Sequence, residues 1–492
     1  RSTRTSTRVK RIWRGRGGEL PRGYHAPMLD SLLTHWMSAD TSIDVAATAL
    51  HDPICKFAAR LDIRASGEIL LHPKSSALTP LCEKADGYPP SPPSQIGSFT
   101  IRVEDRDGTQ AVLLGCSALK QTAKRRDGEF CWAPTLMRAR RLAVGVGTPP
   151  DDWPDVHEVE SECPGLAAWY QPHLRASVPG NPRVGDVAEP VTFPVGDTRT
   201  VTFWATVAAM GVDARGKETP RFKYLARVDS TDAAQPHDLE ETLARCLAIA
   251  GMLAARPILA LPPLFRSRDR RSIRLIGKVP FLVHDLVRST SCVDTDAFLT
   301  HRDAAPVFLE GNSHWDSIES ALYLLVQVMW NETRHVAPSF MLLCMACESL
   351  CSGLEVPSEW DNDEAARLRA HLEAIQTGHE WSSRASQLVG GANASIGRPS
   401  FREQVRFLAK HSDYIVLRGI LGDPKRIKAI KQLRGRVAHR LPKSDTRAAT
   451  LSKDIDALLD LQAIVVAAIC RRLGVNDQGF VATLLRSYGF TG

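Results

Sequence analysis

Apolar and polar residues alternate with a period of two along several stretches of the first 300 residues. In two of them, residues 98–114 and 191–204, a short turn containing Gly and Asp separates two such runs, which is a β-hairpin signal. Residues 222–228 alternate in the same way, and a helical period interrupts the strands at 239–255. The pattern therefore predicts a strand-rich region up to residue 300.

After residue 300 the apolar positions recur every three or four residues, as on one face of a helix. Helix starts are indicated by residues that cap N-termini or favour the first turn. These are Ser313 with Asp316, Pro338, Asp361 with Glu364, Ser400 with Glu403, and Asp423 with Pro424. A last helix is predicted from Asp445 to Gly474. The pattern predicts a bundle of about six helices. We therefore expect an α+β fold, with a strand-rich N-terminal region followed by an all-α helical bundle.

The sequence predicts three regions. Residues 1–27 are rich in Arg, Ser and Thr, which is typical of a disordered basic tail, with a transit peptide as the alternative. Residues 28–300 form the strand-rich region, in which an acidic loop favours a boundary between two subdomains near 150–190. Residues 301–492 form the helical domain.

The composition is that of a globular protein. The chain has 492 residues, 43% of them hydrophobic and 24% charged, which is enough to bury several cores. Its most apolar long stretch, 246–265, is interrupted by Pro257 and again by Pro262 and Pro263, so a membrane-spanning protein is not expected. The 11 cysteines are scattered along the chain, unlike those of a disulfide scaffold. A cytoplasmic location is therefore expected.

Positive charge is concentrated in one short segment. Between Lys425 and Arg447 there are nine basic residues and one acid, Asp445, and this local excess is larger than the +7 of the whole chain. Such a cluster can bind phosphates through Coulomb attraction and the release of counterions. A solvated basic helix face is the alternative.

Arg434 lies in the apolar stripe of the helix predicted to contain it, with Ile430 and Val437 on either side. A half-buried guanidinium is costly unless it is paired. We therefore expect Arg434 either to be neutralised by a carboxylate or to meet an anionic ligand. His439 follows five residues later, near the C-terminal end of the helix, where partial negative charge favours a protonated imidazole.

The segment Leu433–Arg440, LRGRVAHR, resembles the motif of the HEPN superfamily, an Arg followed a few residues later by a His with small or aliphatic residues before it. The helical segment 340–350, FMLLCMACESL, extends the resemblance to the ApeA-type branch, an anti-phage defence family. The segments Gly67–Leu70 and Leu166–Trp169 are similar to the N-terminal domain of that branch. Gly435 departs from the family, in which a polar residue, often Asn, usually follows the Arg.

A second Arg and His with the same separation, Arg406 and His411, occur upstream. Spacing alone is weak support for either pair, because chance matches are expected in a chain with 15 His. Arg434 and His439 are preferred because they lie in the basic cluster and end a helix before Pro442.

The resemblance implies a metal-independent endoribonuclease that acts in anti-phage defence by abortive infection. Arg434 and His439 would be its catalytic residues, because a forked guanidinium can hold a phosphate and an imidazole can transfer protons. Glu348 is a candidate to orient Arg434, and a structural ion pair is the alternative. The residues expected to bind RNA are the neighbouring cations Lys431, Arg436 and Arg440.

The resemblance also implies partners. RNA, with tRNA as one candidate, would be the substrate, and a phage-derived signal would act through the N-terminal region, which senses infection or restrains the nuclease. The reaction needs two acid–base groups, and one copy of the chain supplies a single His for these roles. A homodimer through the helical domain is therefore expected. No metal or cofactor is expected. Two alternatives stay open: a helical domain without catalysis that binds RNA or a protein, and a protein-interaction domain with no nucleic-acid role.

Three cysteines, Cys344, Cys347 and Cys351, recur along the apolar segment that contains Glu348. No second Cys or His pair stands at zinc-finger spacing, and thiols are often buried as small apolar groups. These cysteines are therefore predicted to lie in the core.

Overall fold

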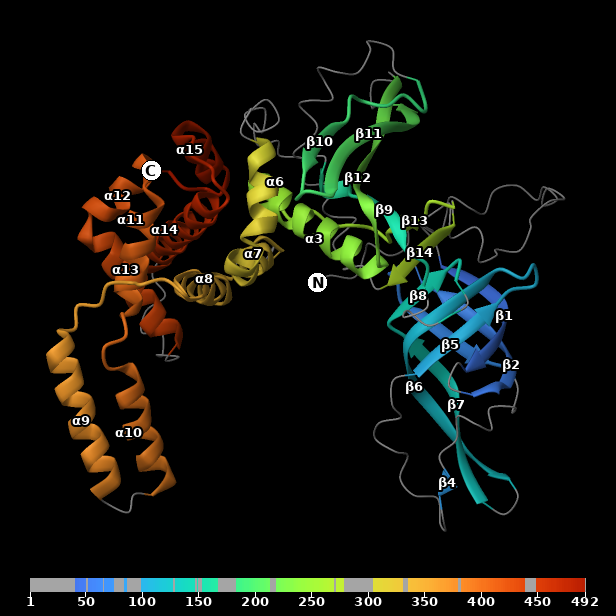
Figure 1. Ribbon diagram of the computed structural model, residues 1–492, viewed down its shortest axis with the longest axis horizontal. Helices are drawn as coiled ribbons and strands as arrows, with labels where there is room; N and C mark the ends of the chain where they lie inside the picture. The colour runs from blue at the N-terminus through green and yellow to red at the C-terminus, as the bar shows by residue number, and fades with distance from the viewer. Residues whose placement is uncertain are drawn as a thin grey trace. The chain divides into compact units, whose positions relative to one another are not determined.

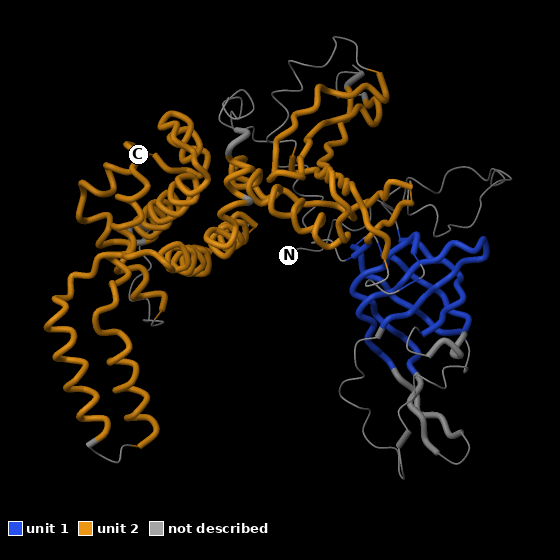
Figure 2. Tube along the Cα trace, in the orientation of Figure 1, with its two compact units in different colours: residues 1–149, 276–278 blue, residues 150–275, 279–492 orange. Residues whose placement is uncertain are grey.

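The computed structural model divides the chain into two compact units, shown in Figure 2. Unit 1 comprises residues 1–149 and 276–278, and unit 2 comprises residues 150–275 and 279–492. The predicted tail, 1–27, lies outside the described residues. The described residues are 40–49, 52–64, 66–74, 84–85, 99–126, 129–146, 148, 153–166, 183–212, 218–269, 271–277, 304–330, 335–378, 382–438 and 448–491.

Six strands of unit 1 close into a cylinder. Each is antiparallel to its neighbours, in the order β1-β2-β3-β7-β6-β5 and back to β1. Apolar side chains alternate inward along the strands, and Leu61, Ile69, Leu71 and Ile101 are fully buried in this core. The six strands are β1 (Thr41–Ala49), β2 (Asp52–Ile63), β3 (Ile69–Pro73), β5 (Phe99–Glu104), β6 (Gln110–Arg126) and β7 (Glu129–Ala139). Two shorter strands join the cylinder, β4 (Lys84–Ala85) beside β7 and β8 (Arg141–Val144) beside β6.

The hairpin predicted over 98–114 is formed by β5 and β6. Its turn is longer than two residues, because Glu104 pairs with Gln110 across the loop. The Asp105 carboxylate accepts hydrogen bonds from the backbone N–H groups of Asp107 and Thr109, at 3.1 and 3.0 Å. Gly108 has a φ of 83°, a left-handed conformation that favours glycine. The Asp-Gly signal was therefore correct for the turn.

Unit 2 begins with an antiparallel sheet in the strand order β10-β11-β12-β9-β13-β14, in which β14 belongs to unit 2 up to residue 275. Figure 1 shows helix α3 (Pro236–Leu253) beside this sheet, and buried residues of α3 pack against β12 and β9. The hairpin predicted over 191–204, the strand over 222–228 and the helix over 239–255 are all confirmed. The strands are β9 (Val156–Glu162), β10 (Val191–Pro194), β11 (Arg199–Val212), β12 (Glu218–Ala234), β13 (Leu264–Arg266) and β14 (Ser272–Gly277), and the 3-10 turn η3 (Pro164–Leu166) follows β9.

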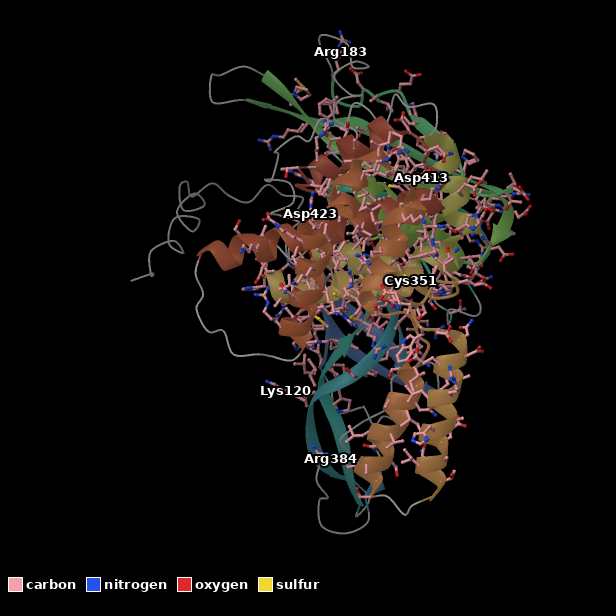
Figure 3. The ribbon with its side chains drawn as sticks, turned by 90° about the vertical axis from the view of Figure 1, so that its left-hand side faces the viewer. Lys120, Arg183, Cys351, Arg384, Asp413 and Asp423 are labelled. Atoms are coloured by element: carbon pink, nitrogen blue, oxygen red, sulfur yellow. The ribbon has the colours of Figure 1, made fainter. Side chains whose placement is uncertain are left out.

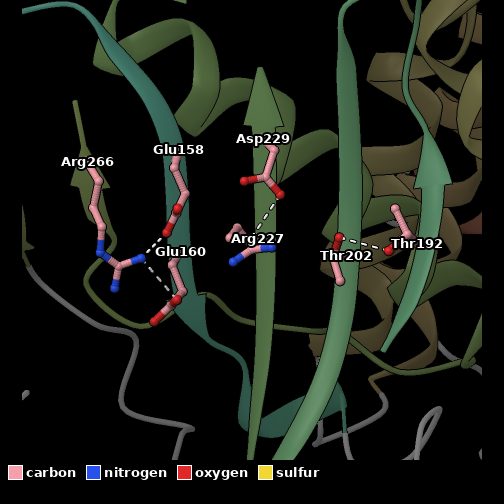
Figure 4. A network of polar contacts seen from close by, with 7 residues as sticks. All are labelled: Glu158, Glu160, Thr192, Thr202, Arg227, Asp229 and Arg266. Atoms are coloured by element: carbon pink, nitrogen blue, oxygen red, sulfur yellow. Dashed lines mark hydrogen bonds and ion pairs between the residues drawn. The ribbon is translucent and has the colours of Figure 1, made fainter. Parts of the chain in front are cut away.

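The other face of this sheet carries charged side chains, seen closely in Figure 4. Arg266 on β13 is ion-paired with Glu158 and Glu160 on β9, at 3.2 Å for Glu160. Arg227 pairs with Asp229 at 2.8 Å on β12. Partial burial raises the pKa of Glu160 and lowers the pKa of Arg266. We call this surface the charged sheet face. Its members are Glu158, Glu160, Glu162, Lys223, Arg227, Asp229, Arg266 and Arg274.

Ten α-helices follow in the described part of the chain. The α+β class is thereby confirmed, with a strand-rich N-terminal half followed by a helical region. The predicted number, about six, was too low, because α6, α10, α12 and α15 were not recognised. They are α6 (Ala304–Ser313), α7 (Trp315–Trp330), α8 (Val336–Cys351), α9 (Asn362–Gly378), α10 (Ser383–Ser395), α11 (Phe401–Ser412), α12 (Arg418–Gly422), α13 (Pro424–Ala438), α14 (Ala448–Arg472) and α15 (Gln478–Ser487); the short 3-10 helix η4 (Ile415–Leu417) precedes α12.

Most of the predicted helix starts are correct. Ser400 and Glu403 form the expected capping box at the start of α11. Asp361 accepts backbone hydrogen bonds at the start of α9, at 3.0 and 2.9 Å. Ser313 was misassigned: its hydroxyl donates to the Leu309 carbonyl at 3.1 Å, so it closes α6 and α7 begins two residues later.

Helix α14 is the centre of the helical region. It packs against α7, α8, α11 and α13, and its residues 461–470 are all buried. The helices also join the sheet, since Phe308 on α6 stacks on Phe193 of β10 with ring centroids 4.9 Å apart. Within the described residues, no helix has the length and apolarity to cross a membrane.

Candidate active site

Helix α13, which carries the first six of the nine cations of the basic cluster, is anchored to α14 by one buried ion pair. Its start is labelled at Asp423 in Figure 3, where the Asp423 carboxylate accepts the backbone N–H of Lys425 at 2.8 Å. Ile427, Ile430 and Leu433 are buried beneath the helix. Arg426 forms a bidentate pair with Asp460 on α14, with its Nε 2.9 Å from the carboxylate. The Asp460 side chain is only 5% exposed, and hydrogen bonding to it raises the pKa of Arg426.

Arg434 is held by side chains from two other helices. Its Nη2 donates to the Glu348 carboxylate on α8 at 2.5 Å. Its guanidinium carbon lies 4.5 Å from the ring centroid of Phe401, the first residue of α11. A guanidinium stacked on a ring and tied to a carboxylate has a fixed orientation. The site is therefore assembled from α8, α11 and α13.

The Arg434 side chain is 40% exposed and that of Glu348 is 42% exposed. Arg434 is thus only half-buried, although its sequence position is within the apolar stripe. A guanidinium has five N–H donors, and the described residues supply one acceptor, Glu348. The remaining donors can meet an anion that approaches from solvent. The structure brings Arg434 and Glu348 together, as the sequence suggested they would be.

The other predicted site residues differ in their surroundings. Lys431 is exposed and makes no ion pair with a described residue. Arg436 is ion-paired with Asp454 on α14, and the two side chains are 42% and 20% exposed. His439 and Arg440 lie outside the described residues. His439 is joined directly to Ala438, the last residue of α13.

Gly435 faces open space. A Cβ atom placed on it would meet no atom within 4 Å. The position next to Arg434 can therefore hold a side chain without a clash in the described structure. Packing among the described residues therefore does not require a glycine at this position.

The second Arg and His pair lies on α11 and has other partners. Arg406 is 3.8 Å from the Glu359 carboxylate, a weak ion pair at the surface. His411 stacks on Phe407 with ring centroids 5.3 Å apart. The two side chains are engaged separately.

The three cysteines of α8 lie in the core, as predicted. Cys344, Cys347 and Cys351 are all buried, and burial raises the pKa of Cys344 to about 12. In the part of the chain that the structure describes, no three His, Cys, Asp or Glu side chains are grouped so that they could hold a metal ion.

Three positioning residues were missed in the sequence. Phe401 beneath Arg434, Asp460 beneath Arg426 and Asp454 beside Arg436 each come from another helix. One signal was present for Asp460, because it directly precedes the apolar run 461–470, where an acid is costly unless paired. Phe401 and Asp454 carry no comparable signal.

No protein-family model, curated protein or solved structure matches this chain. The resemblance of the segments 433–440 and 340–350 to HEPN proteins stays a prediction, and the site is interpreted from its own geometry.

Proposed function

We propose that the protein is an endoribonuclease that cleaves RNA without a metal ion and uses Arg434 and His439 as its catalytic residues. The observation that carries this proposal is the fixed, half-exposed Arg434, held by Glu348 and Phe401 five residues before His439. A guanidinium with free donors in a basic helix is suited to hold a phosphate diester.

The reaction is an attack by a ribose 2′-hydroxyl on the adjacent phosphate. A bond forms between the 2′-oxygen and phosphorus, and the bond from phosphorus to the 5′-oxygen breaks, leaving a 2′,3′-cyclic phosphate and a 5′-hydroxyl. Arg434 stabilises the charge that develops on the phosphate oxygens. His439 transfers one of the two protons that move, and the matching residue of a second copy supplies the other.

The biological setting of the proposal is anti-phage defence in the cytoplasm by abortive infection. It is supported by the sequence resemblance of 433–440 and 340–350 alone. In this setting the strand-rich half senses a phage-derived signal or restrains cleavage, and tRNA is one candidate substrate.

The first test is cleavage of total RNA and of tRNA by the purified protein in EDTA, with the cut ends mapped. We expect 2′,3′-cyclic phosphate ends from the parent. His439→Ala should lower the rate by about 10²-fold to 10⁴-fold. Arg434→Lys should also lose activity, because an ammonium group cannot form the two-pronged contact.

Thermal melting of each variant serves as the control that it still folds. Arg434 and Glu348 are both near 40% exposed, so Arg434→Lys should cost no more than about 1 kcal/mol. The double variant Arg406→Ala with His411→Ala is the matched control and should keep cleavage. Cleavage that survives in His439→Ala but is lost in this control would place the site on α11 instead.

A second candidate function is RNA binding without cleavage. Gly435 favours it, because the polar side chain usual after the Arg in HEPN proteins is missing. The variant Gly435→Asn separates the two functions, since the position is open. Cleavage that appears only in Gly435→Asn would support the binding module as the natural state.

A further inference from the structure

Helix α13 separates its cations by residue type. Each of its three arginines is ion-paired: Arg426 with Asp460, Arg434 with Glu348, and Arg436 with Asp454. Each of its three lysines, Lys425, Lys428 and Lys431, is exposed and makes no ion pair with a described residue. The arginines attach the helix to its neighbours, and the lysines leave positive charge on its surface.

The lysines follow one another at intervals of three residues. At 1.5 Å per residue they extend over about 9 Å of the helix axis, and Arg434 follows Lys431 by one further step of about 4.5 Å. Residues three apart are neighbours on a helix surface. Lys431 therefore connects the other two lysines to Arg434.

Acids border this row on the side of α14. Asp454 is held against Arg436, and Asp456 is close enough to contribute to the raised pKa of Arg426. Asp423 stands at the start of the helix. Among the described residues, the unpaired cations therefore form a strip along α13 with acidic side chains on its α14 side, of which Asp454 is paired with Arg436.

The strip ends beside Gly435, where no side chain stands and a Cβ would have no neighbour within 4 Å. A strand that follows the lysines can therefore approach the helix backbone closely at the residue next to Arg434.

We propose that Lys425, Lys428 and Lys431 guide a single RNA strand along α13 to Arg434, with Gly435 as its point of closest approach. The proposal rests on the proposed function for the identity of RNA as the ligand, and it names the substrate class as single-stranded RNA. One strand presents one row of phosphates to one row of cations, whereas the second strand of a duplex would find no matching row among the described residues of α13. Single-stranded loops and ends are the parts of RNA whose backbone can follow such a row.

The test is a binding titration followed by fluorescence anisotropy, between about 50 and 200 mM salt. The full chain carries His439→Ala so that the RNA stays intact, and the probes are a labelled single strand and the same strand annealed to its complement. For single strands the logarithm of the binding constant falls with the logarithm of salt by about 0.7 per phosphate contact. The triple variant Lys425→Gln, Lys428→Gln, Lys431→Gln should therefore reduce the slope by about 2.

The matched control is Arg384→Gln, which removes one exposed positive charge from helix α10, outside α13. Because Arg384 lies outside the row of lysines, this variant should leave the slope unchanged. Lys428→Gln should reduce it by about 0.7. The substituted side chains are exposed, and Gln has a helix propensity similar to those of Lys and Arg. All these variants should therefore have the same melting temperature as the parent.

Four results would overturn the proposal. They are an unchanged slope in the triple variant, a loss in Arg384→Gln equal to that in Lys428→Gln, tighter binding of the duplex than of the single strand, and no binding of either probe. The nuclease is tested separately. Lysine-dependent binding without cleavage by the parent would favour the second candidate function, RNA binding without cleavage, and keep the strand path. Cleavage whose KM is unchanged in the triple variant would do the reverse.

Discussion

The charged sheet face of unit 2 and helix α13 are both rich in ionised side chains, yet they differ in how their charges are compensated. On the sheet face, four acids and four bases lie on neighbouring strands, and Lys223 with Glu162 at 3.2 Å is one of the pairs. On α13, three carboxylates from other helices compensate the arginines alone. The two surfaces have similar numbers of ionised groups, eight and nine, but the sheet face is balanced and α13 has an excess of three positive charges. The pairing of each charge shows that only α13 has cations left to meet a partner.

The difference follows from the two kinds of secondary structure. Side chains on adjacent strands lie about 5 Å apart, so opposite charges on a sheet face can pair laterally. The outward face of a helix has no neighbouring element, and cations there stay solvated unless a loop or ligand covers them. A helix at the edge of a bundle is therefore the place where unpaired charge accumulates.

The largest expected effect comes from breaking the buried pair that anchors α13. Arg426→Gln leaves the Asp460 carboxylate, only 5% exposed, without its cation. We expect a loss of about 3 kcal/mol in the free energy of unfolding, because an unpaired buried charge is strongly unfavourable. Urea unfolding measures the change. A loss below about 1 kcal/mol would show that Asp460 is compensated in another way.

Arg436→Gln is the control for this experiment. It removes an arginine from the same helix, but Asp454 and Arg436 are both more exposed than Asp460. The expected cost is at most about 1 kcal/mol. Equal losses of unfolding free energy in Arg426→Gln and Arg436→Gln would show that burial does not make one ion pair more important for stability than the other.

An intermediate effect is expected on the charged sheet face. Arg266→Gln removes the cation that both Glu158 and Glu160 contact, and the two carboxylates then repel one another. The expected loss is about 1–2 kcal/mol at neutral pH, since these side chains keep some access to water. Thermal or urea unfolding measures it. An unchanged free energy of unfolding would show that cations other than the directly paired Arg266 also compensate the two carboxylates.

This loss depends on pH with a definite sign. Burial raises the pKa of Glu160 above its ordinary value of 4.5 in the folded protein. At pH values between 4.5 and the raised pKa, the folded state therefore binds more protons than the unfolded state. The free energy of unfolding falls as the pH rises through this range. Because Arg266 lies 3.2 Å from the Glu160 carboxylate, we expect its removal to raise this pKa further. The variant should lose the most stability at neutral pH and the least below pH 4.5, and the opposite trend would contradict the assignment.

Local features of the fold were predictable from the sequence, because they depend on residues close together in the chain. The Asp-Gly turn before β6 and the capping box at Ser400 are examples. Helix α10 was missed, because it is rich in Ala, Ser and Gly, has no buried residue and therefore shows no apolar stripe. Neither the helix propensity of its residues nor a pattern of buried positions indicated a helix there.

The candidate site was only partly predictable. An arginine in an apolar stripe indicated that Arg434 needs a carboxylate, and Glu348 was the candidate. The sequence did not indicate that Phe401 would lie under the guanidinium, or that Arg436 would be taken up by Asp454 while Lys431 stayed unpaired. These contacts join different helices, and their partners depend on how the helices pack. The concentration of cations along α13 was therefore predictable from the sequence. Which of these cations are ion-paired and which are unpaired was not.

The smallest expected effect is a gain of stability at Gly435, which tests whether the unpaired surface of α13 is open. Gly435→Ala should stabilise the protein by about 0.5–1 kcal/mol, because alanine favours a helix interior and its Cβ meets no atom within 4 Å. Gly390→Ala in α10 is the matched control, since that position is equally open. Both variants should melt at higher temperature than the parent. Single-strand binding should weaken only in Gly435→Ala, because the added methyl group stands where the strand comes closest to the helix. A gain of stability with unchanged binding in both variants would show that the strand does not pass over Gly435. A loss of stability in Gly435→Ala would show that this surface is covered rather than open.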